Sequence, residues 1–74
     1  MVRKEVLELV EKELTNAEAQ DIIQAASLES LNEVKVPGSM SAGIAQQRAA
    51  LEVQLDLNKI YIAKLQAKVA EIKA

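Results

Sequence analysis

Apolar residues recur at alternating steps of three and four along the C-terminal part of the chain. This spacing is typical of the seam of a coiled coil, and residues with good helix propensity stand on both sides of it. Two polar residues, Arg48 and Asn58, occupy positions in the same row. We therefore predict one long helix over residues 42–74, with a seam made of Ile44, Arg48, Leu51, Leu55, Asn58, Ile62, Leu65, Val69 and Ile72.

A second apolar row lies on other faces of this helix, formed by Ala49 or Ala50, Val53, Leu57, Ile60 and Tyr61. Between residues 51 and 62 the helix is apolar nearly all round, and such a helix is normally buried on more than one side. We therefore expect it to have at least two neighbours. The predicted interface residues are Leu51, Val53, Leu55, Leu57, Asn58, Ile60, Tyr61, Ile62, Leu65 and Val69.

Part of the same stretch is also compatible with a β-hairpin. Residues 51–57 alternate between apolar and polar, Asn58 and Lys59 could form a turn, and residues 60–62 are good strand formers. The flanking segments favour a helix, because they are rich in Ala, Gln and Lys and a helix propagates through a short ambiguous patch.

The N-terminal part predicts two shorter helices. The first spans residues 2–14, and Thr15-Asn16-Ala17-Glu18 matches a capping box that would end it near Leu14. A second helix would then run from Asn16 to about residue 32, with another possible capping box at residues 30–33. One bent helix through Thr15 is the alternative. The apolar stripe of the first helix is Val2, Val6, Leu9, Val10 and Leu14, with Leu7 at its edge, and the second would bury Ala19, Ile22, Ile23, Ala26, Ser27, Ser30 and part of Leu31.

Residues 37–41 form the clearest boundary. Pro37 disfavours helix at the residue before it, Gly38 permits a turn, and Ser39 or Ser41 can cap the following helix. A loop this short allows antiparallel packing of its flanking helices. The alternative is that Gly38-Ser39-Met40 is a junction at which two polypeptides have been fused, with Met40 as the first residue of the second.

Composition limits the chemistry that the chain can perform. Its 74 residues make one domain (residues 1–74), and they include neither cysteine nor histidine, so disulfides and the usual zinc and haem ligands are absent. Glu11, Glu13, Glu18 and Asp21 are better explained as a solvated acidic face than as a catalytic pair. We therefore expect no enzyme activity, no cofactor, no metal and no small-molecule substrate.

Charge and hydropathy restrict the partners. Residues 1–36 carry four basic and eight acidic side chains, a net charge of −4, and residues 37–74 carry five and three, a net charge of +2. The two parts attract each other, and the basic residues are too dispersed for a nucleic-acid surface. No apolar run approaches the roughly 20 residues of a membrane span, and the first residues given lack the apolar block typical of a signal peptide, so we expect a cytoplasmic protein.

A chain of this length has a marginal core, and association with another helix would supply the missing burial. We therefore predict an all-α fold, a small helical bundle completed by dimerisation, that acts as a protein–protein interaction module by helix packing. Arg48 and Asn58 are either register-setting seam residues or exposed. Two alternatives are a docking domain between subunits of a multi-enzyme assembly such as a modular synthase, and a small regulatory protein that masks a partner's helical groove.

Overall fold

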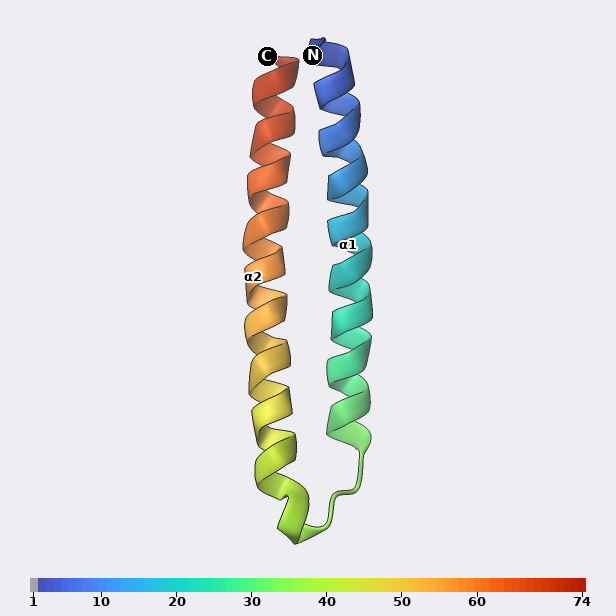
Figure 1. Cartoon of the computed structure of the whole chain (residues 1–74), viewed down its shortest axis with the longest axis vertical. Helices are drawn as coiled ribbons and strands as arrows, with labels where there is room; N and C mark the ends of the chain where they lie inside the picture. Colours follow the sequence, from blue (N-terminus) through green and yellow to red (C-terminus); the bar gives the residue numbers. More distant parts are fainter. Residues whose placement is uncertain (1) are drawn as a thin grey trace.

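The computed structural model describes residues 2–74 as two long antiparallel helices (Figure 1). Helix α1 (Arg3–Glu33) and helix α2 (Ser41–Lys73) lie side by side, and a short 3-10 helix, η1 (Gly38–Met40), precedes α2. Both termini therefore lie at one end of a hairpin that measures 56 × 16 × 14 Å. The all-α prediction is confirmed. Residues 51–62 are helical, so the β-hairpin alternative is wrong.

The seam predicted for the long helix faces α1. The nine predicted seam residues of α2 are the ones that are buried or half-buried, and the other residues of this helix are exposed. The bounds of α2 also agree with the predicted helix to within one residue. This agreement follows from an apolar repeat that runs through the helix without a change of phase.

The prediction of two short N-terminal helices is wrong, because α1 is continuous from Arg3 to Glu33. The hydroxyl of Thr15 does not cap a new helix but donates to the carbonyl oxygen of Glu11 at 3.1 Å. The proposed second cap fails in the same way, since the Ser30 hydroxyl donates to the Ala26 carbonyl at 2.9 Å. A mid-helix Ser or Thr can satisfy its hydroxyl on the preceding turn, so a capping-box sequence does not require a helix start.

The predicted buried face of residues 16–32 is also wrong. Ile22 is 70% exposed and Ile23 is 55% exposed, and Leu31 alone of the residues expected inside is half-buried. Because α1 does not restart at Asn16, its apolar row keeps one phase from end to end. The α1 seam therefore consists of Leu7, Val10, Leu14, Ala17, Asp21, Gln24, Leu28 and Leu31, with Val6 and Ala25 half-buried at its edges.

The connection between the helices has an extended part and a turn. Helix α1 ends at Glu33, before Pro37, and the N–H of Met40 donates to the Pro37 carbonyl at 2.9 Å. The expected serine cap of α2 is wrong: Met40 is the N-cap, no side chain caps the helix, and the Ser41 hydroxyl donates to the Gly38 carbonyl at 2.9 Å. Gly38 has no positive φ, so this turn does not depend on the freedom of glycine.

Candidate interaction surface

The core between the two helices is thin. Only Ala17 of α1, 4% exposed, and Leu55 of α2, 8% exposed, are buried among the described residues. The remaining seam side chains are half-buried, because each helix has a single neighbour and its seam is open at both edges. A two-helix hairpin cannot enclose its seam, so much apolar surface remains in contact with solvent.

Both polar residues of the α2 seam make contacts across the hairpin. The side-chain amide of Asn58 donates to the Ala17 carbonyl at 2.8 Å, and Nε of Arg48 donates to Oδ1 of Asn32 at 2.7 Å. Both residues are therefore half-buried in the seam and are not merely exposed, while their role in setting the register stays a prediction. Each contact ties one residue of α2 to one residue of α1, and such polar contacts can fix the register of two helices.

Two further polar residues of the seam lie on α1. Asp21 and Gln24 each place a side-chain oxygen in a position closed to solvent, and neither Oδ1 of Asp21 nor Oε1 of Gln24 has a hydrogen-bond partner. The sequence predicted Asp21 on a solvated acidic face, which is wrong for this residue, and Gln24 was not singled out, because residues 16–32 were treated as a new helix. The signal was present in the spacing, since both residues continue the row that begins at Leu7.

Tyr61 lies beside the seam and is paired with α1. Its hydroxyl donates to Oε1 of Glu13 at 3.0 Å, and the ring is 42% exposed. The pKa of Tyr61 is raised above its ordinary value, first because of this hydrogen bond and then because of desolvation and the negative charge of Glu13.

The other acidic residues singled out in the sequence do not gather into a site: Glu11 contacts Lys73 at 3.8 Å, and no cluster that could hold a metal ion occurs in residues 2–74.

The structure divides the ten predicted interface residues into two groups. Leu51, Leu55, Asn58, Ile62, Leu65 and Val69 face α1 within the chain. Val53, Leu57, Ile60 and Tyr61 are exposed, with Val53 at 64% and Leu57 at 58%. The long helix α2 has one helical neighbour within the described chain, α1, and its second apolar row is exposed. The expected second neighbour therefore stays a prediction.

One side of the hairpin carries no charged residue within residues 16–34 and 43–61, and toward the chain ends the same rows continue with Glu13, Lys64, Lys68 and Glu71. Residues spaced seven apart share a face of a helix that packs in heptads, which places Gln20, Ser27 and Val34 of α1 beside Gln47, Gln54 and Tyr61 of α2. We call this side the uncharged face. It consists of Asn16, Gln20, Ile23, Ser27, Ser30, Val34, Gly43, Gln47, Ala50, Gln54, Leu57 and Tyr61.

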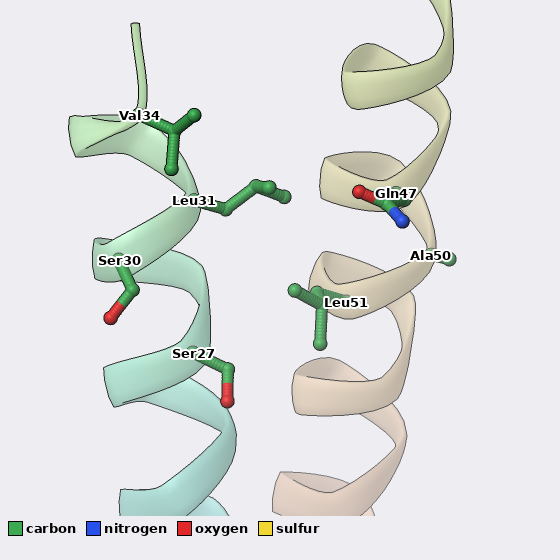
Figure 2. Close-up of a pocket in the computed structure, with 7 residues that line it drawn as sticks. All are labelled: Ser27, Ser30, Leu31, Val34, Gln47, Ala50 and Leu51. Carbon is green, nitrogen blue, oxygen red and sulfur yellow. The ribbon is translucent and has the colours of Figure 1, made fainter.

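The uncharged face is hollowed near the loop end. A hollow of about 640 Å³ is lined by Ser27, Ser30, Leu31, Val34, Gln47, Ala50 and Leu51 (Figure 2). Leu31 and Leu51 point from the two helices into the space between them, while the small side chains Ser27, Ser30 and Ala50 leave it open. A second hollow further along the same face is lined by Gln20, Gln24, Gln54, Leu57, Asn58 and Tyr61.

The opposite side of the hairpin differs in charge. The hollow on that side is lined by Glu18, Asp21, Ile22, Lys59 and Ile62, so that acidic and basic side chains border one exposed isoleucine. The two sides are thus chemically distinct although both belong to the same pair of helices. Ile22 and Ile23 are neighbours in sequence but lie on different sides.

Comparisons with protein-family models, with curated protein sequences and with solved structures find no match for this chain. Neither helix described for residues 2–74 contains a stretch long and apolar enough to cross a bilayer.

Proposed function

We propose that this chain is a non-enzymatic protein–protein interaction module that acts by packing its helices against other helices. One observation carries the proposal: among residues 2–74 the hairpin buries only Ala17 and Leu55, and it displays large apolar side chains on both helices. A domain with so small a core gains stability when a partner covers such residues. Helix packing of this kind completes the small helical bundle that the apolar pattern favours.

The proposal is tested by the size of the assembly that contains the chain. A tagged copy, expressed in the cells that make this protein, should elute from a gel-filtration column well above its own 8.1 kDa. A set of single Glu substitutions at the exposed residues Ile22, Ile23, Val53, Leu57 and Ile60 should include at least one variant that elutes as free chain. Elution of the unaltered chain at the mass of a monomer would contradict the proposal.

A second candidate function is docking between subunits of a larger assembly, with α1 and α2 as the two docking partners joined in one chain. The observation that favours it is the charge difference between the two helical segments, −4 for residues 1–36 and +2 for residues 37–74, with the division at the loop. Charge complementarity of this kind selects partners and sets their orientation.

A further inference from the structure

We infer that the uncharged face binds a second copy of this chain, and that the two hairpins pack with their loops at the same end to form a four-helix bundle. The inference rests on the proposed function and specifies the partner and the surface. Three properties of the described residues support it: the area that the hairpin exposes, the absence of charge on one face, and the opposite charges of the two helices.

The exposed area is larger than a monomer of this mass normally has. The chain exposes 5595 Å², whereas a compact monomer of 8.1 kDa exposes about 4,500 Å². The surplus of about 1,100 Å² is comparable to the roughly 800 Å² that each partner buries in a standard protein interface. A dimer formed through one face of the hairpin would remove a surplus of this size.

The composition of the uncharged face suits contact between identical copies. A two-fold interface brings the same surface of both chains together, so a charge close to the two-fold axis meets its own copy, and a charge further from the axis must find a partner of opposite sign or is buried unpaired. The twelve residues of the uncharged face carry no charge, and they include the exposed apolar residues Ile23, Val34, Leu57 and Tyr61. The small residues Ser27, Ser30 and Ala50 allow a second pair of helices to approach closely. The opposite side lacks this property, because Glu18 and Lys59 border its hollow.

The charges of the helices select the arrangement of the two hairpins. If the loops lie at the same end, a two-fold axis along the bundle places α1 of one copy beside α2 of the other. If the loops lie at opposite ends, α1 packs against α1. The segment that contains α1 has a net charge of −4 and the segment that contains α2 has +2, so the first arrangement brings opposite charges together. Each helix then has two antiparallel neighbours, as in an up-down four-helix bundle.

Pairs of neighbouring residues on opposite sides of the hairpin provide matched variants. Ile23→Glu places a charge on the uncharged face, and Ile22→Glu places the same charge on the other side. Ala50→Glu and Ala49→Glu form a second pair, in which both sites are exposed and Glu is a good helix former, so neither change should unfold the hairpin.

In sedimentation equilibrium the purified chain should have twice its 8.1 kDa mass at tens of micromolar. Ile23→Glu and Ala50→Glu should weaken dimerisation by about tenfold or more, and the two control variants should not.

The arrangement is tested by a distance between the two copies. The chain has no cysteine, so Ser39→Cys in the loop gives one site for a spin label. With loops at the same end, the two labels should lie closer than half of the 56 Å length of the hairpin, because packed helices are about 8–10 Å apart. Separation by about the full 56 Å length would overturn this arrangement.

The outcomes also separate this inference from the proposed function. A purified chain that remains monomeric at high micromolar concentration would overturn the inference. Equal weakening by both members of each variant pair would do the same, because it would remove the uncharged face as the contact. If the purified chain is monomeric while the chain in cells still elutes in a larger assembly, the inference fails and the proposed function stands.

Discussion

Tyr61 is the only aromatic residue of the chain, and its hydroxyl joins the two helices through Glu13. The raised pKa means that the folded hairpin favours the neutral phenol over the phenolate. The contribution of this contact to stability is therefore fully present below the ordinary tyrosine pKa of about 10 and is lost as the pH rises through the raised folded pKa. A titration of tyrosinate absorbance should show a midpoint above about 10 in the intact chain.

The matched variant for this titration is Glu13→Gln. It keeps an oxygen that can accept the hydrogen bond from Tyr61 but removes the negative charge. The midpoint should move only part of the way back toward the ordinary tyrosine pKa, because the hydrogen bond, the largest cause of the shift, is kept and only the effect of the charge is removed. Denaturation in urea should give the same midpoint for both proteins, because the contact is lost on unfolding. An unchanged midpoint in folded Glu13→Gln would show that the negative charge of Glu13 does not contribute to the raised pKa of Tyr61.

Asp21 occupies a seam position although its Oδ1 has no hydrogen-bond partner. An unpaired polar group in such a place costs about 1–3 kcal/mol, so Asp21→Leu should raise the free energy of unfolding by a similar amount. The exposed α1 residue Glu29 provides the control, and Glu29→Leu should change stability by less than about 0.5 kcal/mol. Urea denaturation measures both values. A loss of stability in Asp21→Leu would show that the carboxylate makes a favourable contact.

At the scale of the elements, the long C-terminal helix and its seam could be predicted because the row from Ile44 to Ile72 keeps one phase, although Arg48 and Asn58 interrupt its apolar residues. The N-terminal helix could not be predicted as one element, because Thr15-Asn16-Ala17-Glu18 has the residues of a capping box. Local sequence cannot decide whether Thr15 bonds forward to a new helix or backward to Glu11. Packing against α2 along the whole length of α1 favours the continuous helix, and the phase of the buried row follows from that choice.

Thr15→Ala distinguishes these two roles of the hydroxyl. If Thr15 were an N-cap, its replacement by Ala would cost about 1 kcal/mol. In a continuous α1, Ala has the better helix propensity at this exposed site, so stability should rise by a few tenths of a kcal/mol. Ser30→Ala should behave in the same way, since Ser30 also bonds to the preceding turn. Thermal melts followed by circular dichroism measure both changes, and a clear loss of stability in either variant would indicate a cap.

At the scale of the whole molecule, the uncharged face could not be predicted from the sequence because it combines residues from both helices. Its α1 residues Gln20 and Ser27 come beside Gln47 and Gln54 of α2 only through the antiparallel register. The sequence contained a partial signal in the seven-residue spacing of these positions within each helix. Which row of α1 lies beside which row of α2 depends on the side toward which the loop turns and on which residues form the seam. Both are properties of the folded hairpin.

Each of the two helices should depend on the other for its stability. Peptides of residues 1–36 and 40–74 should each lose helix content when separated, because the thin seam stabilises both helices and the loop keeps them at an effective concentration in the millimolar range. When mixed, they should regain helix in a one-to-one complex that added salt weakens, since the first peptide is acidic and the second is basic. The association is measured by circular dichroism, which compares the helix content of the mixture with the sum of the helix contents of the separate peptides.

If peptide 40–74 alone assembles as stably as the mixture, then α2 associates through its own apolar rows and does not need α1. That result would favour a dimer through the long helix alone over one built from paired hairpins, because the seam that faces α1 would then be available to a second copy of α2.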